Sequence, residues 1–204
     1  DIVKKVAKDF KIVFTPLCGT GNVPIRRALS EVGFENILVV KEEEQPDSNF
    51  AGIEYPNPEE QKALTRGIEL AKKNGADLVI ATDPDCDRVG TAVKHNGEYV
   101  LITGNEMGCL LLNYILEQKS QDDAWPNNPI AVKTIVTSEL TRKIAEKYGV
   151  ELKNVLTGFK YIGSIITDLE KHMNRSKFVF GFEESYGYLA GTFVRDKEAV
   201  STSL

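Results

Sequence analysis

The sequence is poor in the residues on which several classes of protein depend. It has two histidines and three cysteines in 204 residues, and Cys18, Cys86 and Cys109 lie far apart without any Cys-x-x-Cys pair. A disulfide framework, a thiolate zinc site and histidine-based catalysis are therefore not expected, and a reducing cytoplasm fits. No apolar run approaches the roughly 18 residues of a membrane-spanning helix, and no signal-peptide pattern opens the sequence. We therefore expect no membrane partner.

The charge balance gives no reason to expect a polyanionic partner. The formal net charge is −5, which argues against nucleic acid and against an anionic membrane surface. The apolar share of 42% and the charged share of 27% are typical of a globular protein, and the length suits one large domain or two small ones. Because the sequence begins at Asp1 rather than at Met and ends abruptly after Ser-Thr-Ser-Leu, we expect a piece of a longer protein.

The strongest chemical signal is the stretch Ala-Thr-Asp-Pro-Asp-Cys-Asp-Arg-Val-Gly at residues 81–90. Three aspartates, Asp83, Asp85 and Asp87, alternate directly after the apolar run 78–81, and Arg88 follows them. Carboxylates this close repel one another unless a cation or protons compensate. Oxygen-only ligands suit Mg²⁺, Mn²⁺ or Ca²⁺ rather than Zn²⁺. The stretch therefore predicts a divalent-cation site, beside which Arg88 is suited to hold a phosphate oxygen.

Other interpretations of this stretch lead to different functions. Aspartate and proline are ordinary turn residues, so a solvated acidic turn is the plainest one. An EF-hand loop counted from Asp83 needs glycine at its sixth position and glutamate at its twelfth, where this chain has Arg88 and Lys94. That interpretation fails. An aspartyl-phosphate phosphatase, with Asp83 as nucleophile and Asp85 as acid, remains as an alternative.

The pattern of apolar runs predicts two successive α/β units. In the first, strands at 11–15, 37–40 and 78–81 alternate with helices at 23–31 and 58–73, and a hairpin at 89–94 and 98–101 turns at Asn96-Gly97. In the second, helices at 104–118, 139–148 and 162–171 alternate with strands at 130–136, 150–155 and 178–182. The fold class is therefore α/β, with two α/β/α three-layer domains that contain mixed sheets, at residues 1–103 and 104–204.

Each predicted unit has polar loops where its strands end. Open α/β sheets bind ligands at the carboxyl ends of their strands, so the two units are expected to share a cleft that contains these loops. The glycine-rich stretch Thr15-Pro16-Leu17-Cys18-Gly19-Thr20-Gly21 also joins a strand to a helix. It lacks the third glycine of a dinucleotide fingerprint, and we interpret it as a tight turn rather than as a phosphate cradle.

Several separated motifs resemble, in order, those of the α-D-phosphohexomutase (phosphoglucomutase/phosphomannomutase) family. Residues 83–88, Asp-Pro-Asp-Cys-Asp-Arg, are similar to its metal loop, and Thr157-Gly158-Phe159-Lys160 resembles its sugar-phosphate loop. Residues 181–187, Gly-Phe-Glu-Glu-Ser-Tyr-Gly, resemble its sugar-recognition loop, with Tyr186 where many members have glycine. Arg195-Asp196-Lys197-Glu198 resembles the segment that supplies a catalytic lysine. The resemblance covers nearly the whole chain and implies the two middle domains of the family.

The resemblance assigns roles by position. It implies that Asp83, Asp85 and Asp87 hold Mg²⁺, the cofactor. It further implies sugar-phosphate contacts at Thr157 and Gly158 and sugar-hydroxyl contacts at Glu183 and Ser185. It implies two catalytic residues, Arg88, which would steady the phosphate or the substrate, and Lys197, which would act as general acid or base. The implied activity is interconversion of hexose 1-phosphate and hexose 6-phosphate through a phosphoserine and a bisphosphorylated sugar.

The resemblance also bounds what this piece does. The Glu-Glu-Ser pattern implies glucose phosphate as the favoured substrate, with mannose or pentose phosphate as alternatives. No serine here is followed by histidine, so the family's nucleophilic serine loop is missing, and its last phosphate-binding domain would lie beyond Leu204. The isolated chain is therefore expected to be inactive. A further alternative is a non-catalytic module that binds sugar phosphates.

Overall fold

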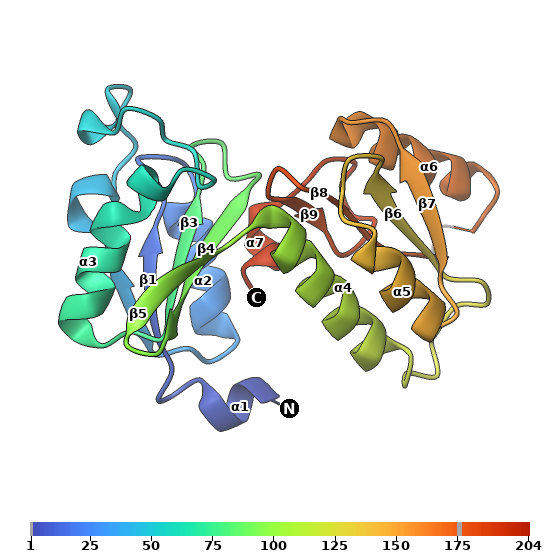
Figure 1. Ribbon diagram of the computed structural model, residues 1–204, viewed down its shortest axis with the longest axis horizontal. Helices are drawn as coiled ribbons and strands as arrows, with labels where there is room; N and C mark the ends of the chain where they lie inside the picture. The colour runs from blue at the N-terminus through green and yellow to red at the C-terminus, as the bar shows by residue number, and fades with distance from the viewer. Residues whose placement is uncertain (1, 175–176) are drawn as a thin grey trace. The chain divides into compact units, whose positions relative to one another are not determined.

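The structure, a computed structural model that describes residues 2–174 and 177–204, divides into two compact units (Figure 1). Unit 1 ends at Ile102 and also includes Ala199–Leu204, while unit 2 spans Thr103–Glu198. The first predicted domain, residues 1–103, ends one residue after Ile102. The predicted second domain runs to residue 204, but helix α7 (Ala199–Thr202) packs against α2 (Asn22–Glu31) of unit 1. The Ala199 N–H also donates to the Cys86 carbonyl at 3.2 Å.

Unit 1 is built on a five-stranded sheet of order β2-β1-β3-β4-β5. Strands β2, β1 and β3 are parallel, and β4 and β5 are antiparallel to their neighbours, which makes the sheet mixed as predicted. Helix α3 lies on one face, and α2 lies on the other with α7 beside it (Figure 1). The strands are β1 (Lys11–Thr15), β2 (Asn36–Val39), β3 (Leu78–Thr82), β4 (Val89–His95) and β5 (Glu98–Ile102). The other helical segments are α1 (Ile2–Val6), α3 (Thr65–Asn74) and the 3₁₀ turns Lys41–Glu43, Phe50–Gly52 and Gln61–Leu64.

The central strands of unit 1 are apolar because both of their faces are covered. Residues 12–15 of β1 and 79–82 of β3 are buried without alternation, as strands between two helical layers are. Val13 and Val79 pack with Leu64 and Ala71 in the core on the α3 side. The predicted β4–β5 hairpin is confirmed, and its turn residues Asn96 and Gly97 have φ values of 50° and 86°, which suit this residue pair.

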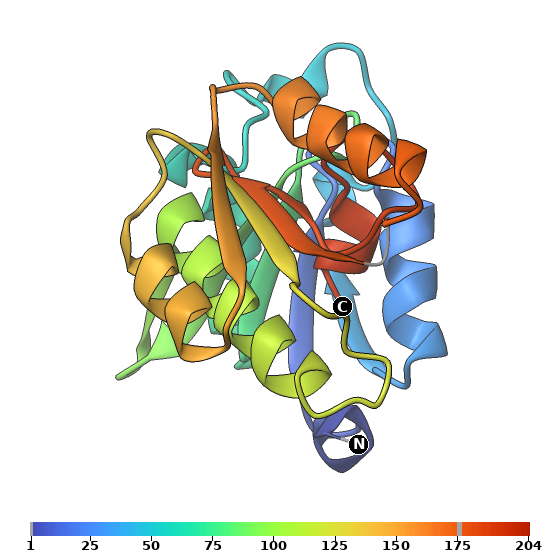
Figure 2. The same ribbon diagram turned by 90° about the vertical axis from the view of Figure 1, so that its right-hand side faces the viewer.

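Unit 2 contains a four-stranded sheet of order β7-β6-β8-β9. The first three strands are parallel, and β9 is antiparallel to β8. Helices α4 and α5 pack together on one face of the sheet, and α6 covers the other (Figure 2). The strands are β6 (Ile130–Thr134), β7 (Glu151–Val155), β8 (Phe178–Glu183) and β9 (Gly187–Leu189), and the helices are α4 (Gly104–Lys119), α5 (Leu140–Lys147) and α6 (Phe159–Lys171). Both units are thus α/β/α layers, as the sequence predicted.

One local prediction was wrong, and one short strand was not predicted. The helix predicted from residue 58 begins as the 3₁₀ turn Gln61–Leu64 and becomes α-helical at Thr65. Asn57 does not cap it, because its side-chain oxygen accepts hydrogen bonds from the Glu59 N–H and from Arg88. Strand β9 was not predicted, since it has only three residues.

Within the described residues, no helix combines the length and the apolar character needed to span a membrane.

Candidate functional site

The three aspartates of the 81–90 stretch converge at the carboxyl end of β3. Each of Asp83, Asp85 and Asp87 offers a carboxylate oxygen that lies within 4.8 Å of the other two. Asp83 is buried, Asp87 is half-buried and Asp85 is exposed, so the cluster opens toward solvent on one side. Cys86 has a left-handed backbone with φ of 62°, which bends the loop between the last two aspartates. The predicted convergence of the carboxylates is therefore present, and an oxygen donor set of this kind fits Mg²⁺.

Asp83 is the fixed member of this cluster. One of its oxygens accepts the Asp87 and Arg88 backbone N–H groups at 3.0 and 2.8 Å, and the other accepts Arg88 Nε at 2.7 Å. Burial alone would raise the pKa of the Asp83 carboxyl, but the hydrogen bonds and the charge of Arg88 outweigh it and lower this pKa. Asp83 therefore stays ionised, and its side chain holds the loop in shape.

Arg88 makes several contacts that sequence reasoning missed. Besides Asp83, its guanidinium donates through Nη1 to Asn57 Oδ1 and to Glu59 Oε1, each at 3.1 Å. These acceptors come from the Tyr-Pro-Asn-Pro-Glu stretch at residues 55–59, about 30 residues earlier. The planar fork of arginine suits such simultaneous pairing. Asn57 and Glu59 therefore hold Arg88, which in turn holds Asp83.

The glycine-rich turn after β1 packs directly against the aspartate loop. A Cβ on Gly19 would lie 2.3 Å from Pro84 Cα, and one on Gly21 would lie 2.5 Å from Thr82 Oγ1. The Thr20 N–H donates to the Pro84 carbonyl at 2.8 Å. Gly19 thus allows close approach to the Pro84 backbone, and Gly21 allows close packing of the Thr82 side chain, in a stretch that forms a turn.

Unit 2 brings together two of its predicted motifs. Glu183, the last residue of β8, is 7% exposed, and its Oε1 accepts the Gly158 N–H at 2.7 Å. Burial raises the pKa of the Glu183 carboxyl, although the Gly158 N–H and the charge of Lys197 oppose this effect. Thr157 is exposed beside this contact. The predicted sugar-phosphate loop and the predicted sugar-recognition loop are therefore physically joined.

Ser185 and Lys197 lie in the same part of unit 2. Ser185 is half-buried in the turn between β8 and β9, and Tyr186 beside it has a left-handed φ of 66°. That conformation favours glycine, the residue that many members of the resembled family would have there. A Cβ on Gly187 would lie 2.4 Å from Lys197 Cδ, so the Lys197 stem crosses the start of β9 at the glycine.

A second group of unit 2 residues was not predicted. Lys133 is fully buried, and Glu184 accepts hydrogen bonds from the hydroxyls of Thr134 and Thr137 at 2.8 and 3.0 Å. The available sequence signal was a lysine inside the apolar strand Ile-Ala-Val-Lys-Thr, because a buried lysine needs specific partners.

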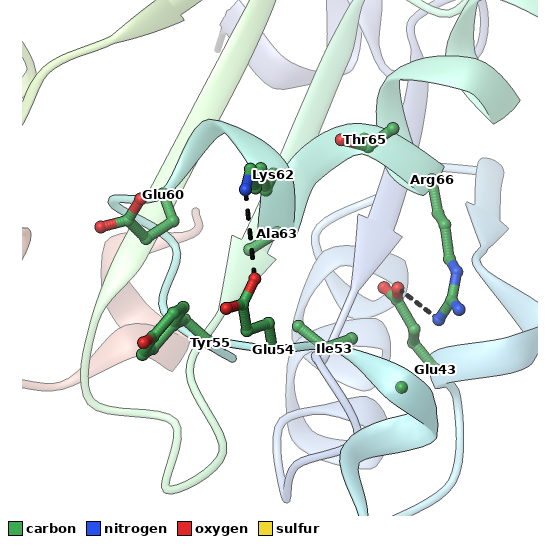
Figure 3. A pocket seen from close by; sticks show the side chains of 10 residues that line it. Glu43, Ile53, Glu54, Tyr55, Glu60, Lys62, Ala63, Thr65 and Arg66 are labelled. Carbon is green, nitrogen blue, oxygen red and sulfur yellow. Dashed lines mark hydrogen bonds and ion pairs between the residues drawn. The ribbon is translucent and has the colours of Figure 1, made fainter.

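A pocket of about 350 Å³ lies elsewhere in unit 1 (Figure 3). On one side Arg66 pairs with the buried Glu43 at 3.1 Å, and on the other Lys62 lies 4.0 Å from Glu54. Thr15 also donates to Glu43, so this buried carboxylate is already satisfied. The residues that line the pocket are Glu43, Gly52, Ile53, Glu54, Tyr55, Glu60, Lys62, Ala63, Thr65 and Arg66. None of the predicted site residues is among them.

Mixed α/β/α units with polar loops at their strand ends define a class of proteins that bind ligands at those ends. The family models for domains II and III of phosphoglucomutase/phosphomannomutase, both described as alpha/beta/alpha, match residues 1–97 and 103–204. The chain belongs to the phosphoglucomutase/phosphomannomutase family.

Known proteins of this family resemble the chain along nearly all of its length. The phosphoglucomutase of Staphylococcus aureus (strain USA300) is 42% identical over 193 residues, which cover 94% of this chain and 34% of that protein. The chain therefore spans about a third of the length of the curated relatives that it matches.

Solved structures share the fold at lower identity. A candidate phosphomannomutase from Thermus thermophilus has a TM-score of 0.78 at 21% identity, over 100% of this chain and 42% of that chain. An N-acetylphosphoglucosamine mutase of Aspergillus fumigatus, solved in complex with GlcNAc-6P and magnesium, has a TM-score of 0.56 at 17% identity. That match covers 98% of this chain and 42% of the other.

Proposed function

We propose that this chain supplies the metal-binding and sugar-binding parts of a phosphoglucomutase-type enzyme. The enzyme would interconvert hexose 1-phosphate and hexose 6-phosphate through a phosphoserine and a bisphosphorylated sugar. The observation that carries the proposal is the convergence of Asp83, Asp85 and Asp87 within 4.8 Å in a chain that belongs to this family. Glucose phosphate is the favoured substrate, with mannose or pentose phosphate as alternatives.

Asp83, Asp85 and Asp87 would hold Mg²⁺. Their carboxylate oxygens are the hard ligands that this cation prefers, and the solved Aspergillus relative contains magnesium. When bound, the cation would neutralise negative charge on the phosphoryl group. Arg88 would contribute mainly by fixing Asp83, since its guanidinium already pairs with Asp83, Asn57 and Glu59. Its remaining donors are available for a phosphate oxygen.

The unit 2 residues would bind and orient the sugar. Glu183 keeps one carboxylate oxygen beyond the contact with Gly158, and Ser185 offers a hydroxyl that both donates and accepts. Thr157 and Gly158 would contact the sugar phosphate. Lys197 would move a proton as general acid or base. We also propose a cytoplasmic location, which fits cysteines that form no disulfide within the described residues.

The aspartyl-phosphate alternative is not favoured. Asp83 is 1% exposed, and both of its oxygens accept hydrogen bonds, so it is poorly placed to attack phosphorus. The family membership also supports a mutase rather than a phosphatase. A hydroxylamine-labile phosphate on Asp83 would revive the alternative.

Cation binding to the chain tests the proposal directly. Mn²⁺, which takes the same oxygen ligands, can be followed by electron paramagnetic resonance of the free ion. Asp85→Asn should weaken Mn²⁺ binding at least about tenfold, because one of three converging charges is lost. Asp9→Asn, a change of an exposed aspartate of the same unit, should have no effect. Equal affinity of both variants would remove the metal assignment.

A further inference from the structure

The turn between β8 and β9, residues 184–186, is held in an unfavourable shape. Tyr186 has a left-handed backbone, which bulky side chains rarely adopt. The Glu184 carbonyl oxygen lies so close to α4 that a Cβ on Gly104 would be 1.8 Å from it. A strained turn persists only where surrounding contacts determine it. The Glu184 side chain contributes two of the hydrogen bonds at this turn.

The Glu184 carboxylate accepts hydrogen bonds from two hydroxyls. Thr134 and Thr137 both donate to Glu184 Oε2, at 2.8 and 3.0 Å, and their Oγ1 atoms are 2.6 Å apart. Thr134 is 0% exposed and Thr137 is 3% exposed. Hydrogen bonds to an ionised acceptor in such a shielded place are stronger than those between neutral groups. The Glu184 side chain therefore anchors the turn to Thr134 and Thr137.

The segment that carries these hydroxyls is itself rigid. The buried Lys133 ammonium donates to the carbonyls of Thr134 and Thr137 at 3.2 and 2.9 Å, and it pairs with Glu139 at 2.9 Å. A buried ammonium must keep such partners, because leaving it unpaired costs far more than one ordinary hydrogen bond. The three contacts tie the chain between β6 and α5 to the buried Lys133 side chain.

We propose that Thr134, Thr137 and Glu184 form a positioning network that determines the position of Ser185. Lys133 supports this network by holding the segment that carries the two threonines. The two consecutive glutamates then have separate tasks. Glu183 bonds to Gly158 in the proposed ligand-binding surface, whereas the Glu184 side chain bonds to Thr134 and Thr137 and fixes the turn. What Ser185 binds rests on the proposed function, but the positioning network does not.

Amide hydrogen exchange measured by NMR on the whole chain tests the network without any ligand. In a Thr134→Val/Thr137→Val variant, the amides of residues 185–187 should exchange at least about tenfold faster relative to those of β6, because the turn loses its anchor. Thr134→Ser/Thr137→Ser keeps both hydroxyls and should restore slow exchange. Thr167→Val is the control, since it removes a hydroxyl whose bond to Gly163 lies within α6.

The proposal is overturned if exchange in the turn stays unchanged, or if it accelerates equally throughout unit 2. If the double valine variant does not fold, Glu184→Gln and Glu184→Ala give the same comparison. Glutamine keeps an acceptor oxygen for the hydroxyls and should preserve the turn, while alanine should release it. Equal exchange in these two variants would also reject the network.

Titration with glucose 6-phosphate, followed at the same amides, separates the two proposals. In the unsubstituted chain, we expect chemical-shift changes at the amides of residues 157–158 and 185–187. These changes should be lost in the Thr134→Val/Thr137→Val variant and restored in the Thr134→Ser/Thr137→Ser variant. Absence of shifts in the unsubstituted chain would count against the proposed function. The exchange comparison would still decide the positioning network.

Discussion

The Glu183 carboxylate accepts the backbone N–H of Gly158 at 2.7 Å, across 25 residues of sequence. This single hydrogen bond joins the end of β8 to the start of α6, so two motifs that are separate in the sequence form one surface. Because one oxygen is committed to Gly158, the Glu183 side chain cannot rotate freely. In the proposed function, the other oxygen would therefore meet a ligand in an orientation that is already fixed.

The burial of Glu183 should make stability depend on pH. Its pKa is raised above 4.5, the ordinary value, so the folded state binds the proton more tightly than the unfolded chain does. Between 4.5 and the raised folded pKa, the free energy of unfolding should consequently fall as the pH rises. Glu183→Gln removes this contribution and keeps an acceptor for Gly158.

Urea unfolding of this variant and of the unsubstituted chain, repeated at several pH values, measures the effect. The stability of Glu183→Gln relative to the unsubstituted chain should increase through the window. The same Glu-to-Gln change at the exposed Glu117 is the control. A difference that is constant with pH, or that has the opposite sign, would contradict the prediction.

Asp83 and Asp85 should differ in their effects on stability. Asp83→Asn should lower the free energy of unfolding by about 3 kcal/mol, because an amide would face Arg88 in a buried site. Asp85→Asn should change it by less than about 0.5 kcal/mol, because Asp85 is exposed. Chemical denaturation without divalent cations measures both. Equal destabilisation would mean that the loop is not held through Asp83.

Gly187→Ala should displace Lys197 at little cost in stability. The added Cβ would meet Lys197 Cδ, which belongs to a flexible side chain that can move aside. We expect a stability change below about 1 kcal/mol. In an active enzyme that contains this chain, turnover should fall by at least about tenfold if Lys197 moves the proton.

A double-mutant cycle checks the cause of that loss. In a Lys197→Ala background, Gly187→Ala should lower turnover no further, because the displaced group is already gone. Additive losses would assign a separate role to Gly187.

The 204-residue chain alone should not interconvert glucose 1-phosphate and glucose 6-phosphate. None of its serines is followed by histidine, so the phosphoserine loop that would donate the phosphoryl group is absent from this sequence. A coupled dehydrogenase assay with Mg²⁺ and glucose 1,6-bisphosphate measures this, with the Staphylococcus aureus phosphoglucomutase as the positive control. Sustained turnover by the purified chain would show that its catalytic residues have been misassigned.

Features determined by neighbouring residues were predictable from the sequence. The alternation of Asp83, Asp85 and Asp87 needs only one bent loop to bring the carboxylates together, and Asn96-Gly97 determines its own turn. The layer order followed from apolar runs that alternate with helical periods. In these cases the chemistry and the geometry lie within a few residues.

Features that depend on tertiary contacts were not predictable. Arg88 pairs with Asn57 and Glu59 across 31 and 29 residues, and no local pattern specifies those partners. The acceptors of Lys133 include backbone carbonyls, whose directions depend on the path of the chain after β6. Sequence can flag a lysine in an apolar strand as unusual, but it cannot name the groups that satisfy it.

The return of residues 199–204 to unit 1 has a consequence for how the chain is made. A ribosome completes the β1–β5 sheet first, then the whole of unit 2, and only afterwards releases the segment that packs on α2 and bonds to Cys86. The part of the surface of unit 1 that this segment covers therefore stays exposed to solvent until the other unit has been synthesised. The aspartate loop, which contains Cys86, acquires its contact with Ala199 only after that delay.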